Sequence, residues 1–179
     1  PAYRNSLDQE EPAVALAALQ EGVIDTSTQF RCGYTYYNAD MPDFHPLCMG
    51  THGYLNVIEA LTVSCNIFFY DTGYNLGIDN MNLYQRKLGL GELTGVEIYE
   101  SDGTLAGPDE KEDWYGGDTI MAAIGQSDNL ITPVQLATYA ATIANNGTRL
   151  RTHVVDKITD YSRQTVLEET KPEVVEENI

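Results

Sequence analysis

The chain is poor in basic residues and in cysteine, and it has no long hydrophobic run. Its 179 residues include 10 lysines and arginines against 27 aspartates and glutamates, a formal net charge of −17. Such an acidic surface repels phosphate backbones, so no nucleic-acid partner is expected. The longest unbroken apolar run, Ala13 to Leu19, is far shorter than the ~20 residues of a membrane span. No signal peptide is recognisable either.

What the chain does contain is enough apolar material for a core. Hydrophobic residues make up 42% of a length that suits one domain. The acidity is partly local, because the segment from Glu168 to Glu177 carries five glutamates against one lysine. This composition predicts a solvated or mobile tail.

Helical patterns dominate the sequence. The segment Pro12 to Gln20 has proline at a first helical position and Gly22 just past its end, and it is apolar nearly all round. This pattern predicts a buried helix. Asn56, followed three residues later by Glu59, predicts a capping box that opens a second helix. Further helices are predicted at 67–76, 79–89 and 132–144, and strands at 154–158 and 165–167.

Two small polar residues interrupt an apolar helical run at Ser64-Cys65-Asn66. A Ser-x-Asn triplet alone is a weak signal, but an ordered series of short motifs follows it. The series is Thr94-Gly95-Val96-Glu97, Trp114, Gly117-Asp118-Thr119, Ala123-Ile124-Gly125-Gln126, Thr132-Pro133-Val134-Gln135-Leu136-Ala137 and Ala144-Asn145-Asn146-Gly147. From about Pro12 to His153, this series resembles the transpeptidase domain of class B penicillin-binding proteins, of the elongation type.

The resemblance implies an α/β fold, the penicillin-recognising serine transpeptidase/β-lactamase-like fold, here mainly its helical part. Residues 1–11 would be a remnant of the segment before the catalytic helix, 12–160 a partial transpeptidase domain, and 161–179 an acidic tail or connector. The implied reaction is acyl transfer from D-Ala-D-Ala stem peptides in cell-wall cross-linking. The parent protein would bind β-lactams, be anchored by an N-terminal helix outside the cytoplasmic membrane, and have a glycosyltransferase as a candidate partner.

The resemblance also assigns roles to residues. Ser64 would be the proton-relay serine and Asn66 the residue that hydrogen-bonds the substrate amide. The alternative is that both side chains only cap helix ends. With the flanking series in place, the family roles are the stronger hypothesis.

Two of the three catalytic motifs of the family are missing. At the positions of Ser-x-x-Lys the chain has Asp8 and Glu11, and it contains no Lys-Thr-Gly. An acid cannot replace the proton-accepting lysine that activates a serine, so the chain as written is expected to be inactive alone. Three explanations are open: a degenerate site, a deletion, or numbering that runs across missing residues. The last predicts a break in the chain between Leu7 and Pro12.

The three cysteines of the chain and one histidine fall in or beside a loop predicted over 25–53. Cys32, Cys48, His52 and Cys65 would complete a tetrahedral Cys3His zinc site. Such a site would hold the loop against the turn at Ser64. An extracytoplasmic setting favours instead a Cys32–Cys48 disulfide with Cys65 free. Their spacing is not a standard zinc signature, so both alternatives stay open.

Other functions are compatible with the same scaffold. A non-catalytic descendant would use it to bind stem peptides or a partner protein. A β-lactamase or β-lactam sensor is less favoured, because the Gly-Asp-Thr, Ala-Ile-Gly-Gln and Thr-Pro-x-Gln series points to transpeptidases.

Overall fold

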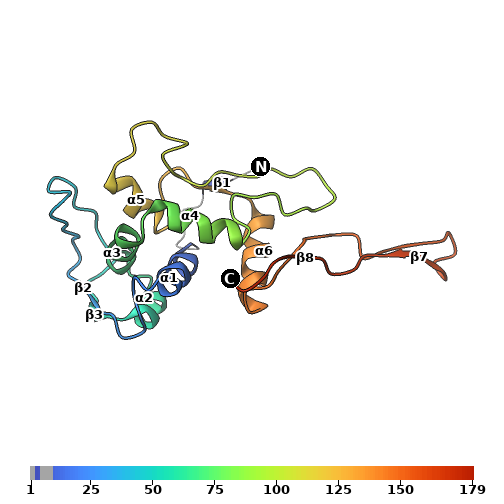
Figure 1. Cartoon of the computed structure of the whole chain (residues 1–179), viewed down its shortest axis with the longest axis horizontal. Helices are drawn as coiled ribbons and strands as arrows, with labels where there is room; N and C mark the ends of the chain where they lie inside the picture. Colours follow the sequence, from blue (N-terminus) through green and yellow to red (C-terminus); the bar gives the residue numbers. More distant parts are fainter. Residues whose placement is uncertain (1–2, 5–9) are drawn as a thin grey trace. The chain divides into compact units, whose positions relative to one another are not determined.

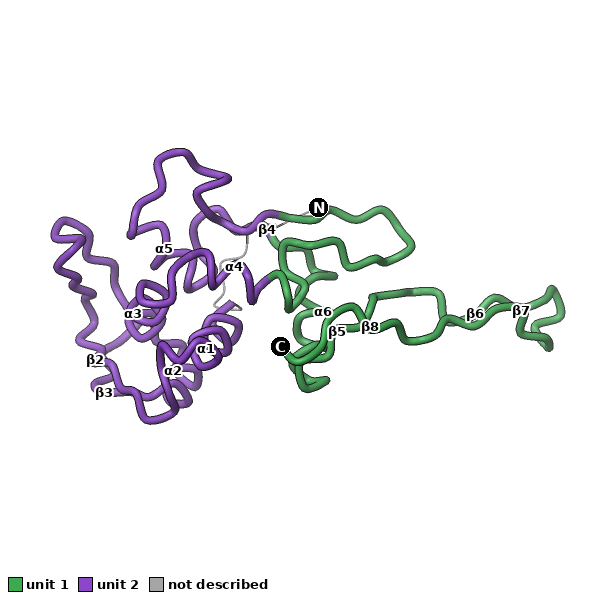
Figure 2. The backbone as a smooth tube through the Cα atoms, in the orientation of Figure 1, with its two compact units in different colours: residues 1–3, 86–103, 131–179 green, residues 4–85, 104–130 purple. Residues whose placement is uncertain are grey.

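The computed structural model describes residues 3–4 and 10–179 of the chain, with helices and short strands (Figure 1). The helices are α1 (Glu11–Gln20), α2 (Val57–Val63), α3 (Asn66–Leu76), α4 (Ile78–Lys87), α5 (Gly116–Ala122) and α6 (Pro133–Ala144). The strands are β1 (Tyr3–Arg4), β2 (Phe30–Cys32), β3 (Gly53–Leu55), β4 (Leu130–Ile131), β5 (Arg149–Leu150), β6 (Lys157–Thr159), β7 (Val166–Glu169) and β8 (Val174–Glu176). The chain divides into two compact units, one of residues 4–85 and 104–130 and the other of residues 1–3, 86–103 and 131–179 (Figure 2).

The helix predicted over Pro12 to Gln20 is α1, and its burial is confirmed. Ala13, Ala17 and Ala18 are fully buried, and α1 packs against α3 and α2 within its unit. Small side chains on most faces allow this close packing, and Pro12 suits the first turn because that turn has no internal partner for its N–H groups. The result is a central helix whose first turn reaches the region of Ser64.

The second buried helix is α3, which packs against α1, α5 and β2. Phe68 and Phe69 are buried to 1% and 0% exposure, and burying each such ring contributes ~1.5–3 kcal/mol. Gly73 lies where α3 meets α5, and a Cβ there would collide with the Cβ of Ala123. The crossing therefore requires a residue without a side chain.

The segment predicted as an irregular loop over 25–53 is partly ordered by strand pairing. Strand β2 pairs antiparallel with β3, with Cys32 opposite Gly53. An isolated bridge joins Thr35 to Leu47. Sequence patterns missed these strands because each is only three residues long and its partner lies more than twenty residues away.

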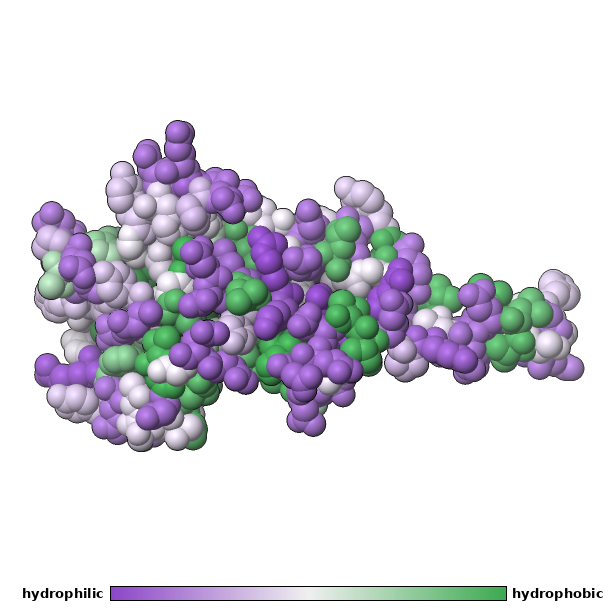
Figure 3. Space-filling model, in the orientation of Figure 1, coloured by the Kyte–Doolittle hydropathy of each residue, from purple (hydrophilic) through white to green (hydrophobic). Residues whose placement is uncertain are grey.

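In the other unit, helix α6 begins with a capping box in which Thr132 and Gln135 each accept a hydrogen bond from the other's backbone. Strand β5 pairs with β8, and β6 with β7. The boundary expected at residue 160 therefore falls inside the β6–β7 hairpin, and the segment expected as a tail contributes two strands. Leu167 and Val174 remain 65% and 49% exposed, and apolar residues of this hairpin are visible at the right of Figure 3.

Among the residues that the structure describes, none of the helices has the length and apolar character needed to cross a membrane.

Candidate functional site

The Ser-x-Asn triplet forms the tight turn between α2 and α3. The predicted capping box starts α2, because Asn56 Oδ1 accepts from the amide of Glu59 at 3.0 Å and Glu59 returns a bond to Asn56. At its other end, Ser64 adopts the left-handed conformation (φ 48°, ψ 65°) that often terminates a helix. Cys65 is the N-cap of α3, but its side chain makes no capping bond. Its sulfur is therefore available for other contacts.

The turn at Ser64 contacts the first turn of α1. The hydroxyl of Ser64 donates a hydrogen bond of 3.0 Å to Glu11 Oε2. Glu11 is only 2% exposed, so this contact lies inside the unit. The prediction that Ser64 lies near the N-terminus of the buried helix is confirmed, and the residue at the expected lysine position is a carboxylate that accepts from Ser64.

Asn66 points toward the 25–53 segment. Its Nδ2 donates to the carbonyl oxygen of Leu47 at 3.3 Å. Its Oδ1 is buried and has no hydrogen-bond partner among the described residues. The amide is thus held at one end by the backbone next to Cys48.

A second acid beside the site was not found by sequence reasoning. Glu10 is completely buried, and its carboxyl group lies where a Cβ on Gly125 would stand. Gly125 belongs to the Ala-Ile-Gly-Gln motif and has a positive φ of 72°. The only sequence signal was an acid pair directly before an apolar helix, which is more commonly a solvated helix start. Asp8, at the expected position of the nucleophile, and the predicted break after Leu7 lie outside the described residues.

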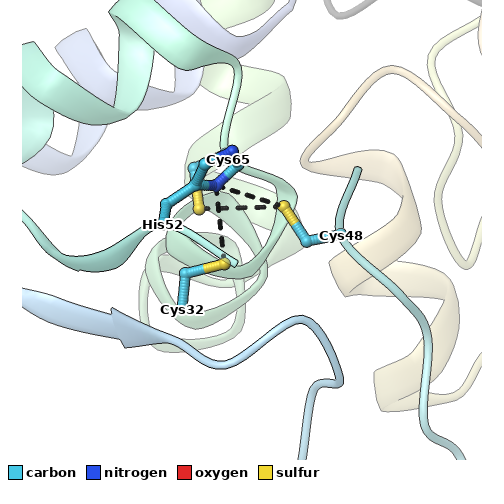
Figure 4. Close-up of side chains that lie close together, drawn as sticks. All are labelled: Cys32, Cys48, His52 and Cys65. Atoms are coloured by element: carbon cyan, nitrogen blue, oxygen red, sulfur yellow. Dashed lines mark hydrogen bonds between the residues drawn. The ribbon is translucent and has the colours of Figure 1, made fainter. Parts of the chain in front are cut away.

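The cysteine and histidine side chains predicted as ligands converge on one point (Figure 4). The donor atoms of Cys32, Cys48, His52 and Cys65 all lie within 4.8 Å of one another. Cys32 comes from the end of β2 and Cys65 from the turn before α3. The cluster thus joins the 25–53 segment to the Ser64 turn, as the sequence predicts.

The spacing of these atoms matches the edges of a zinc tetrahedron. Ligands at ~2.3 Å for sulfur and ~2.0–2.1 Å for nitrogen place two sulfurs ~3.8 Å apart, and a sulfur and a nitrogen ~3.5 Å apart. Nδ1 of His52 lies 3.5 Å from Cys32 Sγ and 3.6 Å from Cys48 Sγ. The sulfurs of Cys48 and Cys65 are 3.9 Å apart. The four residues therefore fit a zinc ion without rearrangement.

The chemical state of the thiols also bears on metal binding. All three cysteines are free, so the Cys32–Cys48 disulfide is not formed. Burial raises the pKa of Cys65. Burial would also raise the pKa of Cys48, but hydrogen bonds from the amides of Gly50 and Ile67 outweigh it and lower that pKa. Backbone donors thus already favour one thiolate in the cluster.

A model of the penicillin-binding protein transpeptidase domain matches residues 12–179. The chain belongs to this family. Peptidoglycan D,D-transpeptidase MrdA of Acinetobacter baumannii is 34% identical over 152 residues, which are 81% of this chain and 23% of that protein. The predicted resemblance to class B members of the elongation type is confirmed.

Solved structures agree with this family. The crystal structure of Pseudomonas aeruginosa PBP2 in complex with WCK 5153 matches with a TM-score of 0.82 at 26% identity, covering 96% of this chain and 39% of that chain. A peptidoglycan synthase complex that coordinates polymerization and crosslinking matches with a TM-score of 0.84 at 28% identity, covering 99% and 30%. The predicted penicillin-recognising α/β fold is confirmed, and the chain spans under a quarter of the MrdA protein it matches.

Proposed function

We propose that this chain is part of a peptidoglycan D,D-transpeptidase that transfers the acyl group of D-Ala-D-Ala stem peptides and is acylated by β-lactams. The observation that carries the proposal is the placement of the Ser64 turn against the buried N-terminus of α1, with 3.0 Å between Ser64 Oγ and Glu11 Oε2. A reacting group and its proton carrier must lie within hydrogen-bond reach or one water of each other. This placement gives the relay serine that geometry.

In this proposal Ser64 relays a proton and Asn66 binds the substrate amide. The Nδ2 group of Asn66 would exchange its bond to Leu47 for one to the substrate, and its buried Oδ1 can accept from a peptide N–H. A nucleophilic serine with an adjacent base, and an oxyanion hole, are still required for acyl transfer. The chain as written supplies neither motif, so the parent protein would have to contribute them.

A second function is favoured by one specific observation, the carboxylate of Glu11 at the position of the lysine. A buried acid that accepts from Ser64 cannot act as the cationic base of the family. The alternative is therefore a descendant of the fold that binds stem peptides, or a partner protein, without reacting with them.

Labelling with fluorescent penicillin separates the two functions. The 179-residue chain should remain unlabelled, because it has no serine with a lysine at the family spacing. The longest natural polypeptide that contains the chain should be labelled covalently, and Ser64→Ala should slow its labelling. Ser162→Ala, in the exposed β6–β7 turn, serves as the matched control. A natural polypeptide that takes up no label would refute the transferase proposal in favour of the binding descendant.

We propose further that Cys32, Cys48, His52 and Cys65 hold a structural zinc ion. The distances given above support a closed tetrahedral site with four protein ligands, which is the arrangement of structural rather than catalytic zinc. Bound there, zinc would crosslink the 25–53 segment to the residue between Ser64 and Asn66. The test is metal analysis of the purified chain, with one zinc per chain expected. A chain that folds fully without metal would contradict it.

The proposed setting is the outer side of the bacterial cytoplasmic membrane, where stem peptides are cross-linked, with a parent protein anchored by an N-terminal helix. Stem peptides and β-lactams would be the ligands. A glycosyltransferase is the proposed partner, supported by the similarity to a complex in which polymerization and crosslinking are coordinated. Co-purification of the parent protein with such an enzyme would test this partner.

A further inference from the structure

A groove with a volume of about 550 Å³ lies in the same unit as the Ser64 turn, between residues 40–44 and the start of α5. Pockets for small ligands have volumes of ~300–1,000 Å³. The groove is therefore large enough for one or two residues of a peptide. It is too small for a stable protein interface, which buries ~1,200–2,000 Å².

The floor of the groove depends on two glycines. A Cβ on Gly116 would lie 3.1 Å from Sδ of Met41, and one on Gly117 would lie 3.3 Å from the ring of Phe44. The absence of side chains lets the loop approach α5 this closely. Met41 and Phe44, together with Met121, give the groove an apolar strip that suits an aliphatic chain.

The rim of the groove is acidic. Lys111 and Asp118 pair with each other at 2.6 Å, and Asp40 accepts a bond of 2.7 Å from the hydroxyl of Tyr74. Asp43 is exposed and has no hydrogen bond or ion pair among the residues that the structure describes. Three carboxylates thus face one ammonium group.

The surroundings strengthen this field, because residues 109–113 add four acids around Lys111. A cleft lined by charges of one sign concentrates ligands of the opposite sign. The groove is therefore complementary to a cation on an aliphatic stem.

The wall of the groove is continuous with the Ser-x-Asn site. Leu47, whose carbonyl accepts from Asn66, follows Phe44 by three residues, and Cys48 of the metal cluster comes next. Tyr74, which holds Asp40, lies on α3, the helix that begins at Asn66. The same loop and helix that fix the site therefore also shape the groove.

We propose that this groove binds the amine-bearing side chain of a stem peptide, a primary ammonium group on an aliphatic chain. The ammonium would lie between Asp40 and Asp43, and the methylene groups would lie along Met41 and Phe44. This inference rests on the proposed function, in which an amine of a neighbouring stem peptide resolves the acyl-enzyme. The groove would collect that strand beside the site before the reaction.

The only tryptophan of the chain provides the readout. Trp114 precedes Tyr115 at the rim, and its Nε1 donates to Thr119 of α5 at 2.9 Å. The 179-residue chain is titrated with Nα-acetyl-lysine amide while the fluorescence of Trp114 is followed. The control ligand is the Nα,Nε-diacetyl amide, which has the same stem without the charge. Saturable binding of the first compound only, weakened by salt, is expected.

Substitutions identify the carboxylates. Asp43→Asn should weaken binding by about two- to fivefold, the usual effect of one exposed ion pair. Asp156→Asn removes the same charge from the β6 region and should change nothing. Equal binding of both ligands, no binding, or an unaffected Asp43→Asn variant would each overturn the proposal.

The penicillin experiment distinguishes this inference from the proposed function. If the parent protein is labelled and lysine amide does not bind, only the groove assignment fails. If lysine amide binds and no natural polypeptide containing the chain is labelled, the assignment to an acceptor strand fails together with the transferase.

Discussion

Ser64 and Glu11 are 53 positions apart in sequence, and the Ser64 hydroxyl donates a hydrogen bond of 3.0 Å to the Glu11 carboxyl group. This contact couples the α2–α3 turn to the first turn of α1. Glu11 is also placed favourably for a carboxylate, because the N-terminus of a helix carries partial positive charge. The contact is therefore an internal structural bond of this chain as well as the feature that separates it from a lysine-containing site.

Removing the donor of this bond should destabilise the chain. Ser64→Ala is expected to lower the free energy of unfolding by ~1.5–3 kcal/mol, because a buried carboxylate loses a hydrogen bond. The measurement is urea denaturation followed by circular dichroism. In a Glu11→Ala background the same Ser64→Ala change should cost much less, because the partner is already gone. Equal costs in the two backgrounds would mean that the bond is not formed.

Metal binding should depend on one histidine and not on its neighbour. His52→Ala is expected to weaken zinc binding at least about tenfold, because it removes a direct ligand of the proposed site. His45→Ala is the matched control, since His45 contacts Tyr36 and Tyr37 instead. Competition with a chromogenic chelator measures both affinities, and equal losses would argue against the Cys3His set.

The same site should respond to acid and to chelators. Thiolate and neutral imidazole ligands must be deprotonated, so zinc affinity should fall as the pH falls. Removing the metal should speed amide hydrogen exchange at Cys48, whose N–H donates to Tyr34, and leave exchange in α6 unchanged. Unchanged exchange at Cys48 would contradict a crosslinking role.

Local patterns were sufficient to predict the long helices. Pro12 at the start of α1 and the Asn56 capping box act within one turn, so their effect is visible in sequence. Helix α5 and most strands were not predicted, because β2 and β8, for example, are three residues long and are stabilised by distant partners. Pairing of this kind depends on tertiary contacts more than on propensity.

The candidate site shows the same division. The cysteine and histidine set was predictable because these residue types are rare in the chain and have few other uses. The burial of Glu10 against Gly125 was not, since an acid before a helix is normally solvated, and only the tertiary fold removes it from water.

The crossing of α3 and α5 predicts a second stability effect. Gly73→Ala should destabilise the chain by ~1–3 kcal/mol, because the added methyl group collides with Ala123 and forces the helices apart. Alanine is otherwise the better helix former, so a loss of stability would isolate the steric term. Gly33→Ala is the control, because a Cβ there meets no atom within 4 Å. A stabilised Gly73→Ala variant would show that the helices are not this close.

The loop at Thr94 gives a prediction about pH. Burial would raise the pKa of Glu100, but hydrogen bonds from the Thr94 side chain and from the amides of Thr94 and Gly95 outweigh it, and the pKa lies below the ordinary 4.5. A carboxyl group whose pKa is lowered by folding contributes stability that is complete above its unfolded pKa and is lost as the pH falls through the folded value. Glu100→Gln should therefore be less stable than the parent chain at pH 7, and the difference should shrink steadily below pH 4.5. Urea denaturation at pH 7, 5, 4 and 3 measures it, with Glu112→Gln as an exposed control of equal charge change. A difference that stays constant down to pH 3 would mean that the Glu100 carboxylate is not what holds this loop.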